Sequence, residues 1–150
     1  MKVKVNAKLN LSLNVYQKVG ERHQISSVAV SVNIFDVVQV TKREDSNVTV
    51  SGMDMPLQNN VAYKTAVAFA KTFDTCGVDV IITKGIPMGA GMGGSSADSS
   101  AVIYCMCKLF DVDVNSQQIK QFSHFASISL QNSFHTEHID ILFYIIRGID

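Results

Sequence analysis

The first fifty residues alternate between apolar and polar side chains. The runs with this period of two cover residues 9–15 and 28–34, and shorter valine-rich runs cover 37–40 and 48–50. Because successive side chains of a strand point to opposite faces, each long run predicts a β-strand with one apolar face. Polar breaks over residues 17–24 and 42–47 predict the hairpin connections between these strands.

The period becomes helical after Asn60. Apolar side chains recur at helical spacing from Val61 to Phe73, with Asn60 as the predicted N-cap and Gly77 as the predicted stop. Residues 78–82 alternate again and predict one more strand. Two further helices are predicted over 96–110 and from 116 to about 128, the latter capped by Asn115 or Ser116. A block of strands followed by helix, strand, loop and helix predicts an α+β fold.

A glycine-rich segment separates the predicted strand 78–82 from the next helix. It reads Pro87-Met88-Gly89-Ala90-Gly91-Met92-Gly93-Gly94-Ser95-Ser96. Glycine adopts positive φ and has no side chain, so such a backbone can curl around an anion with its N–H groups pointing inward. The start of the following helix adds unpaired N–H groups and the positive end of the helix dipole. The segment therefore predicts a phosphate-binding loop, in which the Ser95 and Ser96 hydroxyls cap the helix or reach a phosphate oxygen or Mg²⁺.

Three other interpretations of the glycine-rich segment fit it less well. The segment is not a Walker loop, because no Gly-Lys-Ser/Thr follows it, and it does not fit the spacing of a dinucleotide-binding motif with its ribose-binding acid. A flexible hinge in front of a helix is the other alternative. Hinges seldom combine a proline, four glycines and a Ser-Ser cap between a strand and a helix, so we favour the phosphate loop.

The composition of the chain excludes some classes of binding partner. The chain has 150 residues, 47% hydrophobic and 17% charged, with 13 basic and 13 acidic side chains. Such a balance gives no long-range field for nucleic acid or an anionic membrane, so neither is expected as a partner. No signal peptide is visible and the three cysteines form no paired framework, which predicts a soluble, cytoplasmic protein. Cys76, Cys105 and Cys107 are expected as buried or half-buried helix residues.

Three segments together resemble a known family. The glycine loop closely resembles the second motif of the GHMP kinases, which include galactokinase, homoserine kinase and the mevalonate kinases. Ala7-Lys8-Leu9-Asn10-Leu11-Ser12-Leu13 and Asn60-Val61-Ala62-Tyr63-Lys64-Thr65-Ala66 resemble two further motifs of its isoprenoid-precursor branch. The motifs occur in the family's order between about residues 3 and 122. The resemblance implies a ribosomal-protein-S5-like N-terminal domain, with the family's C-terminal ferredoxin-like domain missing.

The resemblance also implies an activity: ATP- and Mg²⁺-dependent phosphorylation of the diphosphocytidyl-methylerythritol precursor of isoprenoids, a small-molecule substrate. By position, Lys8 would be the catalytic residue near the accepting hydroxyl, and Asn10 and His23 would bind substrate. The segment Glu21-Arg22-His23 lacks the aromatic residue of the family's Gly-Tyr-His, which leaves another acceptor open. Asn60 and Lys84 would lie at the adenine. The ATP phosphates would lie on Pro87, Met88, Gly89, Ala90, Gly91, Met92, Gly93, Gly94, Ser95 and Ser96.

The sequence departs from the family near its end. The family carries its catalytic aspartate after the third helix, whereas Phe125 to Asn132 contains no acid here. We therefore predict an N-terminal ATP-binding domain over 1–125 and a divergent tail over 126–150 produced by a frameshift or premature stop, with impaired activity. In that tail, His135, Glu137 and His138 lack the further ligands of a metal site, and no metal is predicted. Two other hypotheses are a non-catalytic nucleotide-binding remnant and a homodimer formed through the surface left by the missing domain.

Overall fold

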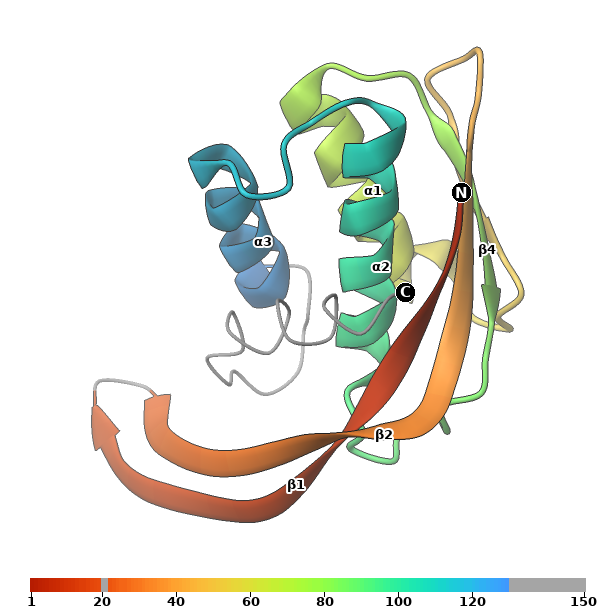
Figure 1. Cartoon of the computed structure of the whole chain (residues 1–150). Coiled ribbons are helices and arrows are strands. Elements are labelled where there is room, and N and C mark those ends of the chain that lie inside the picture. The colour runs from red at the N-terminus through yellow and green to blue at the C-terminus, as the bar shows by residue number, and fades with distance from the viewer. Residues whose placement is uncertain (20–21, 130–150) are drawn as a thin grey trace.

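The computed structural model describes residues 1–19 and 22–129 (Figure 1). Within them one mixed sheet is formed by β1 (Lys2–Val19), β2 (Arg22–Lys42), β3 (Val48–Ser51) and β4 (Val78–Thr83). The strand order is β1-β2-β4-β3, and only the β3–β4 pair is parallel. Three α-helices lie on one face of the sheet: α1 (Val61–Phe73), α2 (Gly94–Leu109) and α3 (Gln117–Ser129). A short 3₁₀ helix, η1 (Leu57–Asn59), precedes α1. The predicted α+β fold is confirmed.

The core lies between the sheet and the helices. Alternate residues of β4, namely Val78, Val80 and Ile82, are buried, as the period of two predicts. Phe69 of α1 is fully buried and packs edge-on against Phe122 of α3, with ring centroids 5.6 Å apart. Aromatic pairs favour this edge-to-face arrangement. The glycine-rich segment is therefore followed by a helix that belongs to a packed layer.

The two long strands extend beyond this layer. β1 pairs with β2 from Lys2–Gln39 to Val19–Arg22, whereas β2 pairs with β4 only over residues 37–42. The part of the β1–β2 ladder over residues 8–19 and 22–31 pairs with no third strand among the described residues, and Figure 1 shows it bending away below the helices. We call this two-stranded extension the arm. The predicted polar break over 17–24 is thus too long, because the strands continue to Val19 and from Arg22.

The helix ends follow local capping rules. The Asn60 side chain accepts hydrogen bonds from the amides of Ala62 and Tyr63, at 2.9 and 3.3 Å, which confirms the predicted N-cap of α1. The predicted stop at Gly77 is wrong, because α1 ends at Phe73 with Asp74 in the left-handed conformation (φ 49°). The lack of a side chain at Gly77 instead permits close approach to Asn47, because a Cβ there would lie 1.8 Å from the carbonyl oxygen of Asn47.

The other helices lie close to their predicted bounds. α2 begins at Gly94, two residues before the prediction, and α3 begins after Ser116, whose hydroxyl accepts the amide of Ile119 at 3.2 Å. Cys105 and Cys107 are buried in α2, as predicted, and burial raises the pKa of both thiols to about 12. Cys76 is half-buried in the connection between α1 and β4, not in a helix.

Several predictions concern residues 130–150, which lie outside the described residues. They include most of the divergent tail and the segment with His135 and His138. Within the described part of the chain, no helix is long and apolar enough to cross a membrane.

Candidate phosphate-binding site

The glycine loop connects the end of β4 to the start of α2. It lies where β1 and β2 leave the packed layer to form the arm (Figure 1). Residues 87–91 are exposed, and the Met88 side chain is 67% exposed. Residues on both sides of the loop are buried, Ile86 before it and Ala97 after it. The loop is therefore an open backbone surface on a fixed base.

The loop backbone has the conformation that its glycines allow. Gly89, Gly91 and Gly93 have φ values of 73°, 71° and 76°, in a region that other residues avoid. A Cβ at Gly89 or Gly91 would have no atom within 4 Å. The glycines there are required by backbone conformation, and the space above them remains open to a ligand.

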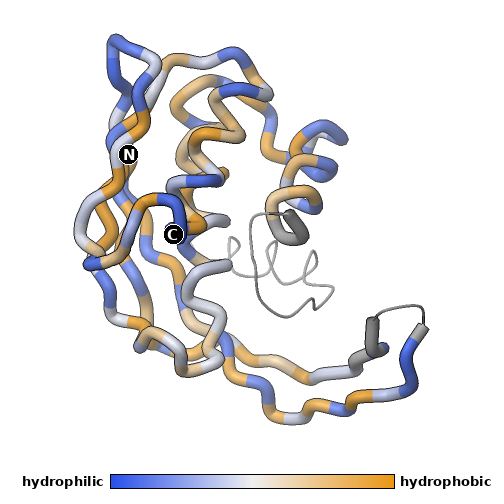
Figure 2. Tube along the Cα trace, turned by 180° about the vertical axis from the view of Figure 1, so that it is seen from behind, coloured by the Kyte–Doolittle hydropathy of each residue, from blue (hydrophilic) through white to orange (hydrophobic). Residues whose placement is uncertain are grey.

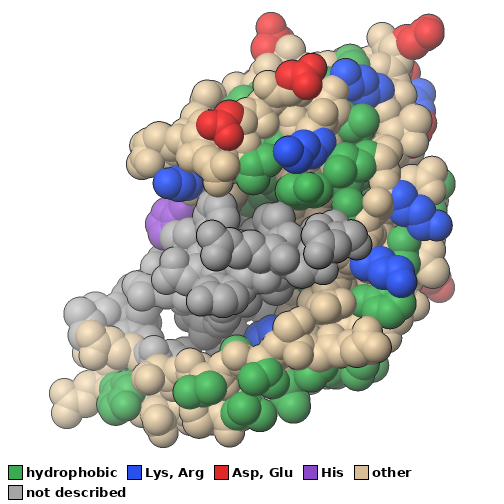
Figure 3. Space-filling model, viewed as in Figure 1, with side chains coloured by type: hydrophobic (Ala, Val, Ile, Leu, Met, Phe, Trp, Pro, Cys, Tyr) green, Lys and Arg blue, Asp and Glu red, His purple; other side chains and the backbone are tan. Residues whose placement is uncertain are grey.

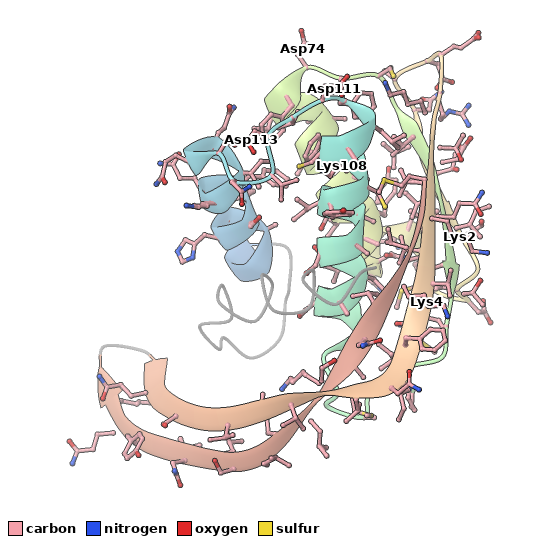
Figure 4. The ribbon with its side chains drawn as sticks, in the orientation of Figure 1. Lys2, Lys4, Asp74, Lys108, Asp111 and Asp113 are labelled. Carbon is pink, nitrogen blue, oxygen red and sulfur yellow. The ribbon has the colours of Figure 1, made fainter. Side chains whose placement is uncertain are left out.

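The start of α2 faces this open loop. Gly93 is the N-cap and supplies no side-chain hydrogen bond, and the first turn holds no acidic residue. The first N–H groups of a helix have no acceptor inside the helix and carry partial positive charge. Figure 4 shows Asp74, Asp111 and Asp113 gathered at the opposite end of the helices. The charges of these carboxylates therefore lie away from the helix end that would bind an anion.

Lys8 lies directly beside the loop. Its backbone amide donates to the carbonyl of Met92 at 3.1 Å. Its side chain runs across Gly93, where a Cβ would lie 3.2 Å from the Lys8 Cγ. Burial lowers the pKa of Lys8 because it disfavours the charged form. A residue from the first strand is thus in direct contact with a loop some eighty positions later in the sequence, and the roles predicted for both stay predictions.

Of the predicted substrate-binding residues, the structure places Asn10 next to Lys8. The Lys8 ammonium donates to the Asn10 Oδ1 at 3.2 Å, and both side chains are partly buried. His23 lies in β2 at the far end of the arm, opposite Lys18 in the ladder. The side chain of His23 lies outside the described part of the chain.

The two residues predicted to lie at the adenine have protein partners instead of open surroundings. Asn60 is 3% exposed, and its carbonyl oxygen caps α1 while its amide donates to the Met53 sulfur at 3.7 Å. Lys84 is the first residue after β4, and its ammonium contacts two carboxylates, those of Asp36 in β2 and Asp98 in α2. Sequence reasoning did not single out either carboxylate.

The two carboxylates are almost completely buried. Asp36 is 0% exposed and Asp98 is 2% exposed. Burial raises the pKa of Asp98 to about 7, although the attraction and hydrogen bond of Lys84 oppose that rise. Burial alone would lower the pKa of Lys84, but its hydrogen bonds and charge interactions with Asp36 and Asp98 outweigh it and raise the pKa. A sequence signal for Asp36 existed, since it interrupts the apolar run Ile34 to Val38 and a buried charge needs a partner.

The residues of this site suit the phosphates of a nucleoside triphosphate, but they offer few side-chain ligands for its Mg²⁺. The loop and helix start suit phosphate oxygens, as the open space above Gly89 and Gly91 shows. No group of three metal-ligating side chains occurs in residues 1–19 and 22–129. Mg²⁺ commonly takes most of its ligands from water and substrate phosphates, so from this chain the Ser95 and Ser96 hydroxyls are the candidate ligands.

Comparison with known proteins gives a consistent result. Residues 60–147 match the family described as the GHMP kinases N terminal domain. A 4-diphosphocytidyl-2-C-methyl-D-erythritol kinase of Clostridium perfringens is 36% identical over 126 residues, which cover 81% of this chain and 44% of that protein. The protein of the same name from Caldicellulosiruptor bescii is 34% identical over 126 residues, with 81% and 44% covered.

Solved structures share the fold. A crystal structure of 4-(cytidine 5'-diphospho)-2C-methyl-D-erythritol kinase superposes with a TM-score of 0.76 at 21% identity, covering 96% of this chain and 49% of that one. Mevalonate kinase of Methanococcus jannaschii superposes with a TM-score of 0.68 at 9% identity, covering 99% and 52%. The chain therefore spans about half the length of the proteins that it matches.

Proposed function

This chain belongs to the GHMP kinase family, and from that premise we propose that it is the nucleotide-binding part of an ATP-dependent small-molecule kinase. The proposed acceptor is the 2-hydroxyl of 4-diphosphocytidyl-2-C-methyl-D-erythritol. The names of the curated relatives support this acceptor. The observation that carries the kinase proposal is the contact of Lys8 with the glycine loop, because it joins a cation to an open phosphate-binding backbone.

The role proposed for each residue follows from the chemistry of phosphoryl transfer. The acceptor oxygen forms a bond to the γ-phosphorus, the bond from that phosphorus to the bridging oxygen breaks with ADP as the leaving group, and the proton of the hydroxyl is released to solvent. The loop amides and the α2 start would hold the phosphates, and the Lys8 ammonium would offset negative charge at the acceptor and the γ-phosphoryl group. Mg²⁺, for which the Ser95 and Ser96 hydroxyls are the candidate ligands, would supply neutralisation of the phosphate charge when bound. Asn10, which contacts Lys8, would position the acceptor.

Lys8→Ala tests the proposal in the purified chain with ATP and the proposed acceptor. We expect turnover to fall about 10²- to 10³-fold, the usual cost of losing one group that stabilises transition-state charge, with a smaller change in ATP affinity. Lys2→Ala is the matched control, because Lys2 lies on the same strand and is exposed, away from the loop. A chain that binds no ATP, or a turnover rate that is the same in both variants, would contradict the proposal.

A second candidate function is nucleotide binding without turnover. It is favoured by the segment Phe125 to Asn132, which contains no acidic residue where the family resemblance implies the catalytic aspartate. ATP binding by calorimetry, together with a turnover assay on the same preparation, separates the two functions. Binding without product formation, unaffected by Lys8→Ala, would favour this second function. Turnover of a different alcohol would instead favour another GHMP kinase specificity.

A further inference from the structure

A buried cluster of three charged side chains lies beneath the glycine loop. The Lys84 ammonium contacts the Asp36 carboxylate and, at 2.9 Å, the Asp98 carboxylate. The three residues come from three elements: Asp36 from β2, Lys84 from the residue after β4, and Asp98 from α2. The Lys84 side chain is only 19% exposed. The cluster is therefore part of the interior where the two ends of the loop join the packed layer.

Asp36 fixes the chain as it enters the loop. Its Oδ2 accepts from Lys84, while its Oδ1 accepts the backbone amides of Gly85 at 2.7 Å and Ile86 at 2.8 Å. One carboxylate thus binds three consecutive residues immediately before Pro87. Hydrogen bonds to a charged acceptor are stronger than those between neutral groups, so this entry segment is firmly positioned on β2.

Lys84 connects the entry of the loop to its exit. Its ammonium donates to Asp98, one turn into α2, and a Cβ at Gly94 would lie 3.3 Å from the same nitrogen. The entry segment and the first turn of α2 are therefore held to a single charged group. The span of the loop between Ile86 and Gly94 is set by these contacts, since both ends are fixed relative to Asp36.

Stability alone does not account for such a cluster. Burying ionised groups requires removing their water, and well-packed apolar residues often stabilise a fold as well or better. The Asp98 Oδ1 is buried with no hydrogen-bond partner, which adds a further cost. Directed hydrogen bonds do, however, fix backbone positions more narrowly than apolar packing, and a phosphate loop depends on the direction of its N–H groups.

We propose that Asp36, Lys84 and Asp98 act as a clamp that sets the geometry of the glycine loop for phosphate binding, with Lys84 as a positioning residue beneath the loop. This inference rests on the proposed nucleotide-binding function and deepens it. It differs from the role that the family resemblance implies for Lys84, in which the side chain lies at the adenine. The two roles predict different responses to a ligand that has phosphates but no base.

The test measures binding of ATP and of tripolyphosphate to the full chain and two variants. Lys84→Met removes the cation, and Lys84→Met combined with Asp98→Asn also removes one of the carboxylates left unpaired. We expect Lys84→Met to weaken both ligands by the same factor, about tenfold or more, because a small misplacement of binding groups is costly. In the double variant the melting temperature should recover, whereas the affinities should not. Arg43→Met is the matched control, since Arg43 also joins two aspartates, Asp45 and Asp79, but beside the start of β4, whereas the loop follows the end of that strand.

Three outcomes would overturn the clamp. Weaker ATP binding with unchanged tripolyphosphate binding would make Lys84 a contact to the base. Affinities that recover together with the melting temperature would reduce the cluster to a stabilising element. Affinities unchanged in both variants would remove any role in binding. If the unaltered chain bound ATP, the proposed function would survive each of these results; if it bound neither ligand, both proposals would fail.

Amide hydrogen exchange without ligand gives a second measurement that does not depend on affinity. The clamp predicts faster exchange across residues 87–94 in the double variant than in the unaltered chain, with little change in β3. Equal exchange across the loop in the two proteins would contradict the clamp even if binding were impaired.

Discussion

The glycine loop and the arm are both exposed, but they are supported in opposite ways. Beneath the loop lie the buried side chains of Ile86 and Ala97 and the charged cluster around Lys84. Among the described residues, the arm is held by its two-stranded ladder and, at its base, by the contact of Lys8 with the loop, and its apolar side chains face solvent, with Leu11 63% and Val28 58% exposed. Figure 3 shows hydrophobic side chains along the arm, and Figure 2 shows apolar and polar segments alternating along it.

The difference in support corresponds to a difference in what each region can bind. The loop presents an open glycine backbone whose two ends are held by the charged cluster, which suits the proposed binding of a small anion whose oxygens need directed hydrogen bonds. The arm presents apolar surface on a two-stranded ladder, and two-stranded ladders are marginally stable by themselves. Large exposed apolar patches mark contact with another surface. The two regions are therefore suited to a small ligand and to a larger surface, respectively.

The largest expected effect on ATP affinity comes from changing the loop at Gly91. Gly91→Val places a β-branched side chain at φ 71°, in space that no protein atom occupies. We expect ATP affinity to fall about a hundredfold, corresponding to about 2.7 kcal/mol, because the side chain would fill the proposed phosphate position. The backbone strain should cost only about 1–2 kcal/mol of stability. Calorimetric titration and thermal unfolding measure the two quantities.

Asp74→Val is the matched control for that strain. Asp74 has φ 49° at the end of α1, at the opposite end of the helices from the loop (Figure 4). This variant should lose a similar amount of stability and keep its ATP affinity. If Gly91→Val left ATP binding unchanged, the assignment of the phosphate loop would be wrong.

Features that depend on neighbouring residues were predictable from the sequence. The strand 78–83, the N-cap at Asn60 and the loop between β4 and α2 each follow from a short stretch of residues with a known local preference. Lys8 required the family resemblance, because a lone lysine on an alternating strand has no local feature that distinguishes it. Its contact with Gly93 depends on how β1 packs against the loop.

Features that depend on distant contacts were missed, because a short stretch of sequence does not show which distant residues it will contact. Gly77 reads as a helix stop, yet its lack of a side chain serves a contact with Asn47 thirty residues earlier. Residues 9–15 read as a strand with one apolar face, but the register shifts between Asn10 and Ser12, and Leu11 and Val15 are exposed. Alternation predicts a strand; whether a layer covers its apolar side chains is decided by the rest of the fold.

A smaller expected effect is on stability. The pH dependence of stability should differ between the buried cluster and the surface charges. The pKa of Asp98 is about 7 in the folded chain, against an ordinary value of 3.8. The folded state therefore holds a proton that the unfolded state releases, so stability falls as pH rises from about 4 to about 7. Asp98→Asn removes this dependence. Relative to the unaltered chain, its melting temperature should be similar at pH 4 and higher by several degrees at pH 8, since one kcal/mol shifts a domain of this size by about 2–8 °C.

Asp79→Asn should show the opposite sign. Hydrogen bonds from Thr49 and Arg43 lower the pKa of Asp79, so its contribution is present above the ordinary pKa and is lost as the pH falls. The asparagine variant should therefore be less stable than the unaltered chain at pH 7 and approach it at acid pH. The same sign for both variants would show that Asp98 is not the buried, proton-holding group that its surroundings indicate.

The smallest expected change in stability, and the sharpest test of the arm, comes from its exposed apolar residues. Leu11→Ser combined with Val28→Ser replaces two side chains that contribute little to the fold, because both are more than half exposed. The free energy of unfolding should change by no more than about 0.5 kcal/mol per site. We expect the unaltered chain to self-associate through the arm and this variant to do so less, since removal of exposed apolar surface weakens association. Sedimentation velocity across a concentration series measures this self-association.

Leu57→Ser is the matched control, because it alters a leucine that is 43% exposed in η1. Equal association of all three proteins would leave the arm without a role in self-association. A large loss of stability in the arm variant would show that the arm is packed more tightly than its exposure indicates.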